Sequence, residues 1–524
     1  MQDTELAPSR APFPEAPDRP PEAPRPARPA ESGGWLVAVL VLVVGNFMAV
    51  LDVTIVNVAV PSIQKDFGGS LDDVLWIATS YTLMLGLVVP VSGWLAERFG
   101  LARIYALSLA GFAVGSALCG IAGNLGSLIV FRVLQAIPGG IMPVVSMTMV
   151  YVIVPREKLG QAMGIFGVGI VFAPATGPVL GGYFVQHLDW RLVFLVNVPV
   201  GLLGALAAHL VLPRTAGRRG RRFDLPGFTC IGLGLFAVLL AAEEGSDWGW
   251  GGYRILMLLT FGALALAAFV VVELSVDQPL LDLRAFRVWP FTSSLLMLAA
   301  LQVNMIATSF LIPVFLQQGQ GKQAFDAGLL MLPSAVATGL VTPIAGQLYD
   351  KIGPRWLGVF GLGICASGTY LLGGITPNMT RADLIAWSCV WGLGLGLSIM
   401  PLMTAGLAAL PPARTNEGSA LNNVVRQTAG ALGLAVLNAL STSQQAQLFA
   451  DRTALTRATA APPTTPEGLG ELYGRYRTLS VQVLATSYAN LFLVVAALTG
   501  AGVLLALFLR KPSATEGPQM PVGH

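Results

Sequence analysis

The sequence GWLAERFG at residues 93–100 returns in a related form as GQLYDKIG at residues 346–353. Both copies fit the pattern G-x-L-x-[DE]-[RK]-x-G, and each separates two long apolar segments. A repeated turn of this kind indicates that the chain contains two related halves. The first glycines of the two copies, Gly93 and Gly346, are 253 residues apart, so each half has room for several helices.

The composition places both halves in a membrane. Of 524 residues, 54% are hydrophobic and only 11% are charged, whereas about 25% of the residues in a soluble domain are charged. The net charge of +3 is too small and too dispersed to predict binding of nucleic acid. The four cysteines lie in apolar segments without metal-ligand spacing, so we expect packing roles, no metal site and no disulfide for Cys119, Cys230, Cys365 and Cys389.

A membrane-spanning helix needs about 20 mainly apolar residues. By this rule the predicted fold class is an all-α polytopic membrane protein with fourteen transmembrane helices. The expected spans lie near residues 35–60, 72–95, 102–122, 126–150, 159–184, 191–211, 225–244, 253–275, 290–316, 327–349, 355–375, 383–406, 417–441 and 484–509.

The distribution of Lys and Arg predicts the orientation, because short cytoplasmic loops accumulate these residues. Most of them fall on the side of the N-terminus, including a cluster of arginines within 214–222. We therefore expect a multi-pass protein of the cell (inner) membrane with both termini in the cytoplasm. Residues 1–34 form a proline-rich cytoplasmic tail that we expect to be disordered, and residues 511–524 form a second tail.

The repeat also predicts the domain organisation. Its offset spans eight expected helices rather than six, which indicates that two helices are inserted between two six-helix halves. The predicted domains are the N-terminal half at 35–211, the inserted helices with their flanking loops at 212–289, and the C-terminal half at 290–510. Within the last, residues 442–483 form a long outer loop, and we expect the helix before it to continue outward into this loop.

Further motifs follow one another along the first half. They are LDVTIVNVAVP (51–61), RVLQAIPGG (132–140), GPVLGG (177–182) and WRLVFLVNVPVG (190–201). Together with the inner-turn repeat, they resemble the signatures of the major facilitator superfamily, in particular its fourteen-helix drug:proton antiporter branch of the EmrB/QacA type. The chain departs from the usual residues of this branch at Ala136, Pro138 and Ala173. The resemblance implies two pseudo-symmetric halves that hold substrate between them and work by alternating access.

Asp52 is a carboxylate inside an otherwise apolar segment. A charge near the middle of a bilayer costs at least roughly 2.5 kcal/mol, so such a residue is a candidate for function. With a rise of about 1.5 Å per residue, Asp52 lies about 12 Å below the outer end of its helix and Arg132 about 9 Å below the outer end of its own. The two opposite charges therefore share a level. We expect Asp52 and Arg132 to couple transport to protons; a purely structural ion pair is the alternative.

Small residues recur every four positions in the fifth expected helix, at Gly169, Ala173, Gly177 and Gly181. Such a stripe allows the backbone of another helix to approach closely, either for plain packing or for the movement of one half against the other. The resemblance assigns the antiporter motif of this helix to Gly164, Gly177, Pro178, Gly181 and Gly182.

The two inner turns place acidic and basic residues at the cytoplasmic mouth. The resemblance implies that these residues form a charge latch that closes the inner side. The alternative is that the basic residues only anchor the turns at the membrane surface. The expected gate residues are Gly93, Glu97, Arg98, Gly100, Arg103, Asp350 and Lys351.

Polar residues within the expected spans are candidates for a substrate cavity, although amides in membranes also join helices. Relatives that are specialised for quaternary ammonium and divalent cations carry acidic residues on the thirteenth helix, where this chain has Asn422, Asn423 and Arg426. We therefore expect neutral, amphipathic, zwitterionic or anionic substrates rather than dications. The cavity candidates are Asn46, Asn57, Tyr81, Gln135, Gln302, Asn304, Asn423, Arg426 and Gln427.

The function predicted from these features is proton-coupled export of hydrophobic or amphipathic compounds such as drugs, antibiotics and dyes. It requires the proton gradient and no cofactor. Export of an endogenous lipid or metabolite is an alternative, and a channel or receptor is an alternative of another class. The sequence has no protease, hydrolase or P-loop motif, so we expect neither an enzyme nor catalytic residues. The expected partners are protons, small substrates and the lipid bilayer. In a cell with an outer membrane a periplasmic adaptor at the outer loop is a further candidate partner, and a mobile surface loop that only shields the outer vestibule is the alternative.

Overall fold

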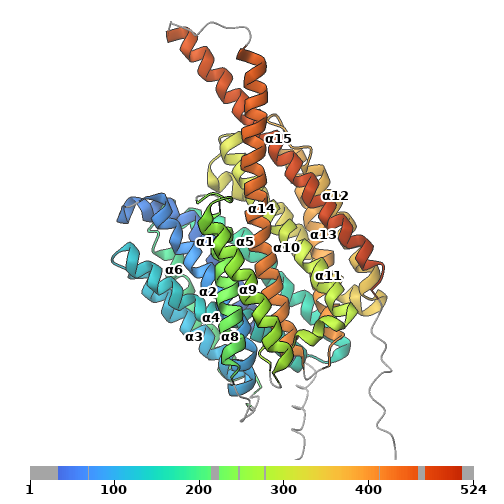
Figure 1. Cartoon of the computed structure of the whole chain (residues 1–524). Coiled ribbons are helices and arrows are strands. Elements are labelled where there is room, and N and C mark those ends of the chain that lie inside the picture. The colour runs from blue at the N-terminus through green and yellow to red at the C-terminus, as the bar shows by residue number, and fades with distance from the viewer. Residues whose placement is uncertain are drawn as a thin grey trace, which may run out of the picture.

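The computed structural model describes residues 34–68, 70–213, 217, 223–245, 248–276, 279–411, 414–457 and 466–509, and within these ranges the regular structure is helical throughout (Figure 1). Nearly all of both predicted tails, and most of the arginine cluster within 214–222, lie outside the described residues.

The helices form an N-terminal group, an intervening pair and a C-terminal group. The N-terminal group comprises α1 (Gly34–Phe67), α2 (Leu71–Phe99), α3 (Leu101–Gly120), α4 (Leu125–Ile153), α5 (Leu159–His187), the short α6 (Leu192–Leu195) and α7 (Asn197–Val211). The pair is α8 (Leu225–Glu244) and α9 (Tyr253–Ser275). The C-terminal group comprises α10 (Trp289–Val314), α11 (Ala324–Ile352), α12 (Pro354–Leu372), α13 (Arg381–Ala408), α14 (Thr415–Arg457) and α15 (Pro466–Ala506). Three short turns of helix accompany them, η1 (Arg156–Lys158), η2 (Leu283–Arg287) and the π-helical η3 (Phe315–Gly319).

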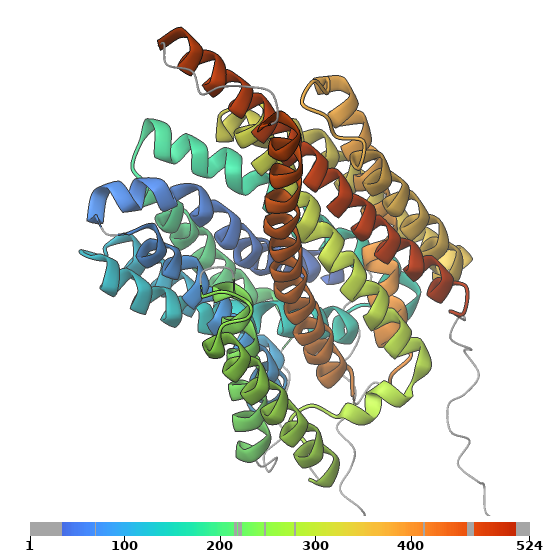
Figure 2. The same ribbon diagram turned by 45° about the horizontal axis from the view of Figure 1, so that its top comes forward.

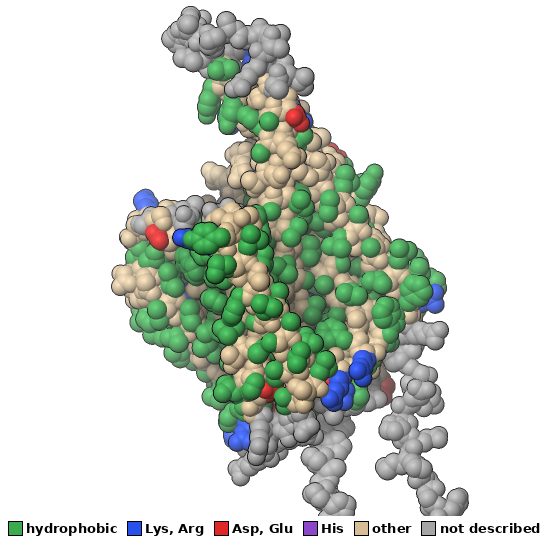
Figure 3. Space-filling view, viewed as in Figure 1, with side chains coloured by type: hydrophobic (Ala, Val, Ile, Leu, Met, Phe, Trp, Pro, Cys, Tyr) green, Lys and Arg blue, Asp and Glu red, His purple; other side chains and the backbone are tan. Residues whose placement is uncertain are grey.

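Twelve of the described helical segments are long and apolar enough to cross a membrane. Two of the fourteen expected spans are not among them, those that correspond to α12 and α14. Glycine and hydroxyl side chains dilute the apolar residues of α12, and α14 carries amides and Arg426. The outer surface agrees with a lipid environment, because apolar side chains are spread widely over the face seen in Figure 3 and charged ones are few. On α9, for example, Met257 and Val271 are each 67% exposed.

The two groups of helices lie side by side (Figure 2) and meet mainly along two seams, with further contacts of α4 with α14 and of α5 with α13. On one side of the molecule α5 packs along α11, and on the other side α2 packs against α14. The packing inside the two groups is also alike. In the N-terminal group α3 packs on α4, and in the C-terminal group their counterparts α12 and α13 pack on each other. The duplicated arrangement agrees with the repeated inner turn.

The helices α8 and α9 form a hairpin at the edge of the bundle (Figure 2). α8 packs against α2 and α14, so it covers the seam where these two helices meet. α9 packs mainly on α8 and leaves most of its surface exposed. The hairpin is therefore placed to brace one seam from outside.

Each inner-turn repeat ends on a glycine with a left-handed backbone. The φ angles are +92° at Gly100, between α2 and α3, and +78° at Gly353, between α11 and α12. A side chain at either position would be strained, since L residues rarely adopt such angles. The chain reverses within one residue at both places, which explains why both repeats require the terminal glycine.

The C-terminal helices α14 and α15 project beyond the rest of the molecule, at the top of Figure 1. α14 continues to Arg457 and α15 begins at Pro466, so helix occupies much of the region predicted as the outer loop. The two projections contact each other through an edge-to-face pair of Phe449 and Tyr476, whose ring centroids are 5.4 Å apart.

Candidate functional site

Asp52 on α1 and Arg132 on α4 form an ion pair in the core of the N-terminal group. Their side chains are 0% and 1% exposed. Arg132 Nη1 donates to Asp52 Oδ2 and, over 2.9 Å, to Gln135 Oε1 one turn further along α4. Arg132 Nε donates to the Ile77 carbonyl on α2 over 3.3 Å. The structure thus brings together the two charges that the depth argument placed at one level.

Two amides complete the surroundings of the carboxylate. Asp52 Oδ1 accepts hydrogen bonds from Gln135 Nε2 and from Asn197 Nδ2 on α7, both over 3.0 Å. Both amides also donate to Ser116 Oγ on α3, over 2.9 and 3.2 Å. Ser116 in turn donates to the Phe194 carbonyl over 3.0 Å. The carboxylate therefore ties α1, α3, α4 and α7 together, and both of its oxygens are satisfied.

Aromatic rings close the site. The Arg132 guanidinium lies 3.9 Å from the centroid of the Tyr81 ring and 5.6 Å from that of Phe194. A guanidinium over an aromatic face is held by the ring quadrupole, and the contact strengthens when water is excluded. Since Tyr81 is only 1% exposed, the pair is sealed from water in this conformation. Proton exchange with Asp52 therefore requires a rearrangement.

Sequence reasoning missed Asn197 and Ser116. Asn197 lies within the motif WRLVFLVNVPVG, where it is the single amide in an apolar run, and this isolation was an available signal. Ser116 gave no comparable signal, because small hydroxyl residues are common in membrane helices and satisfy themselves on their own backbone.

The C-terminal group contains a neutral counterpart of this site. Asn304 on α10 donates to Thr369 on α12 over 2.9 Å and to Thr499 on α15 over 2.8 Å. It also accepts from Trp391 Nε1 on α13 over 2.6 Å. These four helices correspond in order to α1, α3, α7 and α4. Moreover, Ser116 and Thr369 are separated by the same 253 residues as the two inner-turn repeats.

This placement corrects one expectation. Asn304 was expected in the substrate cavity, but it is fully buried among four helices of its own group. Its amide joins these helices, as the alternative role of membrane amides predicts.

The other cavity candidates fall in different places. Tyr81 and Gln135 belong to the Asp52 site, and Asn57 is exposed. Asn46 is buried on α1, and its amide nitrogen has no partner among the described residues. On α14, Asn423 donates to the Ser419 carbonyl of its own helix, Arg426 contacts Gln302 on α10, and Gln427 is half-buried.

The small residues of α5 face two different neighbours. A Cβ atom on Gly169 would lie 2.7 Å from Val43, and one on Gly181 would lie 3.0 Å from Ile55, so the stripe packs against α1 of the same group. Gly164 instead faces the other group, since its Cβ would lie 2.7 Å from the Pro343 Cα of α11. The four-residue stripe is thus an internal contact, and a different set of residues forms the seam between the groups.

The remaining antiporter-motif residues follow the same division. Gly177 belongs to the α1-facing stripe, whereas Pro178 lies near α11, 3.3 Å from where a Gly328 Cβ would be. Gly182 is buried next to Gly181.

The expected gate residues lie at the adjoining ends of α2 and α3 and at the end of α11, and the latch between the two inner turns stays a prediction. Gly93 is buried in α2, Glu97 and Arg98 are half-buried near its end, and Arg103 is exposed on α3. Lys351 is exposed at the end of α11, and the Asp350 side chain lies outside the described part. No ion pair between described side chains joins the two inner turns.

Comparisons with known proteins agree with one another. The model of the Major Facilitator Superfamily matches residues 42–434. The chain is 31% identical over 488 residues to the Multidrug resistance protein B homolog of Mycobacterium tuberculosis. This alignment covers 91% of the chain and 90% of that protein. The chain is 34% identical to the Multidrug export protein EmrB of Haemophilus influenzae, over 77% of this chain and 80% of that protein. It is 29% identical to the Tetracenomycin C resistance and export protein of Streptomyces glaucescens, over 91% and 92%.

Two solved structures show the same fold at low sequence identity. A bacterial homolog of the human lysosomal transporter Spinster, in an inward-facing and unoccupied conformation, aligns with a TM-score of 0.56 and 19% identity, over 92% of this chain and 100% of that one. The proton:xylose symporter XylE aligns with a TM-score of 0.57 and 15% identity, over 88% and 94%.

Proposed function

The chain belongs to the major facilitator superfamily, a family of transporters, and we propose that it exports hydrophobic or amphipathic compounds in exchange for protons. The relatives named for multidrug and antibiotic resistance support drugs, antibiotics and dyes as substrates. The proposal includes fourteen membrane spans, with α12 and α14 among them, in the cell membrane and with both termini in the cytoplasm. The proton gradient supplies the energy, and no cofactor takes part.

The observation that carries the coupling proposal is the sealed Asp52–Arg132 pair. A proton that reaches Asp52 from the acidic outside removes the charge that holds Arg132. The protein then loses the attraction that ties α4 to α1, and the packing of the N-terminal group favours another arrangement. Release of the proton on the inner side restores the pair. Protonation thus drives the return of the empty carrier, which is what exchange of substrate for proton requires.

The test is transport in proteoliposomes with an imposed pH gradient. Wild-type protein should accumulate a hydrophobic dye against its gradient, and Asp52→Asn should abolish this accumulation while dye binding survives. Arg254→Gln, which removes an exposed charge on α9, is the matched control and should behave as wild type. Uphill transport by Asp52→Asn at the wild-type rate would remove Asp52 from the coupling role.

A further inference from the structure

Arg426 is half-buried on α14 and differs from Arg132, the buried arginine of the N-terminal group. Arg132 has a carboxylate partner, whereas no carboxylate among the described residues pairs with Arg426. The polar contact of its side chain is made by Nε, which donates to Gln302 Oε1 on α10 over 3.2 Å. An amide oxygen cannot neutralise a guanidinium, and unpaired ionisable groups inside a membrane mark substrate pathways. The charge is therefore available to an anion.

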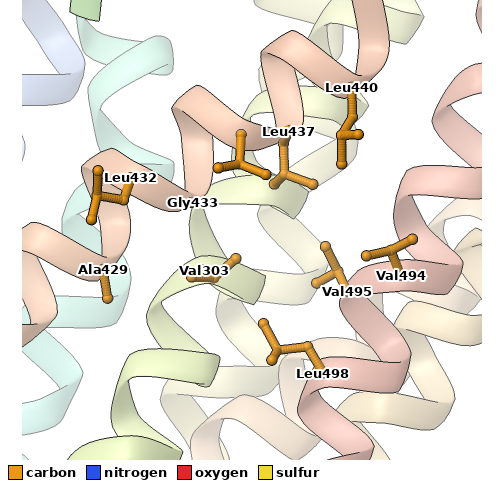
Figure 4. Close-up of a pocket in the computed structure, with 10 residues that line it drawn as sticks. Val303, Ala429, Leu432, Gly433, Leu437, Leu440, Val494, Val495 and Leu498 are labelled. Carbon is orange, nitrogen blue, oxygen red and sulfur yellow. The ribbon is translucent and has the colours of Figure 1, made fainter. Parts of the chain in front are cut away.

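An apolar cleft of about 330 Å³ lies between α14 and α15 (Figure 4). Its first lining residue on α14, Ala429, follows Arg426 by three residues. α14 and α15 form its walls, and Val303 of α10 forms its floor. All of its lining side chains are apolar. On α14 they are Ala429, Leu432, Val436, Leu437 and Leu440, with Gly433 on the same helix, and on α15 they are Val494, Val495 and Leu498. A cleft of this size accepts an alkyl chain or an aromatic ring system.

The arginine and the cleft share one face of α14. Gly433 and Leu437 follow Arg426 by seven and eleven residues, which is two and three helical turns. Gln302, which holds Arg426, directly precedes Val303 on α10. α14 also approaches α10 closely here, because a Cβ on Gly433 would lie 2.7 Å from Val303. One bound molecule can therefore span the charge and the cleft.

We propose that this composite site binds an anionic amphiphile, with its carboxylate or sulfonate at Arg426 and its apolar tail in the cleft. This inference rests on the proposed export function and specifies its substrate class. A cation would meet an uncompensated positive charge, and a neutral compound would leave the guanidinium unpaired. An anion whose headgroup lies at Arg426 and whose tail lies in the cleft accepts a charge-assisted hydrogen bond from the guanidinium. The bond is bidentate where the geometry of the headgroup allows. The cleft adds van der Waals contacts along the tail.

The test measures binding of two matched probes to full-length protein in nanodiscs of neutral lipid. The first probe is an undecanoic acid with a terminal dansyl group, and the second is its methyl ester. Empty nanodiscs give the background from partition into lipid. We expect the wild-type protein to bind the acid at least tenfold more tightly than the ester. Arg426→Gln should abolish this preference, Arg426→Lys should retain part of it, and Arg254→Gln should leave it unchanged.

A second variant tests the cleft. Val494 is 51% exposed at the edge of the cleft, so Val494→Phe can fill the cleft without disturbing the core. It should weaken binding of both probes by a similar factor and keep the preference for the acid. Equal affinity of the wild-type protein for acid and ester would overturn the inference, and so would an unchanged preference in Arg426→Gln. Because the wild-type comparison needs no variant, the inference stays testable even where Arg426→Gln fails to fold.

Transport separates this inference from the proposed function. Arg426→Gln should still export a neutral dye under a pH gradient while it loses export of the acid. If the wild-type protein binds the acid through Arg426 but transports nothing, the site stands and the export function fails. If it exports the dye but shows no preference for the acid, the export function stands and the anionic substrate class fails.

Discussion

Asp52 accepts hydrogen bonds from Arg132, Gln135 and Asn197, so its negative charge holds side chains from two other helices in place. In the proposed exchange the carboxylate takes up a proton, and Arg132 then becomes a buried cation without a counter-charge. Such a cation costs about 3–5 kcal/mol, which is enough to shift an equilibrium between two conformations by two or more orders of magnitude. One residue can therefore couple a proton to a movement of whole helices.

This cost predicts a difference between single and double variants. We expect Asp52→Asn alone to lower the free energy of unfolding by about 3–5 kcal/mol, because Arg132 stays buried and charged. Adding Arg132→Gln should recover most of the stability, since neither charge remains, but should not recover proton-driven transport. Thermal unfolding of the purified protein measures the first effect and proteoliposome transport the second. A double variant that transports uphill would contradict the coupling role of the pair.

The charged and neutral sites of the two groups provide another comparison. Asn197→Ala removes a donor to the Asp52 carboxylate, so the pH profile of proton-driven transport should change. Asn304→Ala leaves Trp391 and two threonines without their amide partner. It should lower stability by about 1–3 kcal/mol and leave the pH profile unchanged. A shifted pH profile in Asn304→Ala would show that the C-terminal site also takes part in coupling.

At the scale of the elements, α5 contacts α1 within its own group and α11 across the seam. The sequence predicted that small residues allow a close helix contact, because glycine spacing is visible in one dimension. It did not predict which neighbour each face meets, since that depends on how the two groups dock. For the same reason, Asn304 was expected in a cavity and is found in a core. The pairing of Asp52 with Arg132 was easier to foresee, because helical rise alone fixes the depth of each charge.

The seam predicts a position-dependent effect of added bulk. Gly164→Leu would drive its side chain into the backbone of α11, where Pro343 Cα lies 2.7 Å from the Cβ position. Overpacking costs about 1–3 kcal/mol, and this cost applies only to conformations in which α5 and α11 are packed here. We therefore expect slower transport in proteoliposomes. Gly363→Leu on α12, where no atom lies within 4 Å of the Cβ position, is the control and should transport normally; equal rates for both variants would exclude a gating role for this seam.

The whole molecule repeats one plan twice, but only the first copy carries an ion pair at its centre. The sequence predicted the all-helical fold of the superfamily, and this prediction is confirmed by the family match and by the two solved structures. The motifs were sufficient because they mark turns and close contacts that the fold requires at fixed places, such as Gly100 and Gly353. The polar networks could not be predicted in full, because their members come from four helices that are distant in sequence.

The projecting ends of α14 and α15 lead to a prediction about the outer side of the molecule. Leu472, Tyr473 and Tyr476 on α15 are exposed by 53%, 70% and 58%, and such apolar side chains on a projection can contact a partner or shield the outer opening. Deleting residues 450–470 leaves Asp52 and Arg426 untouched, so we expect transport in proteoliposomes to continue. Export from whole cells that have an outer membrane then decides the role of the projection. Export that continues at the wild-type level would exclude an adaptor and favour shielding. Export that is lost from cells, while proteoliposomes still transport, would support a periplasmic adaptor docked on this projection.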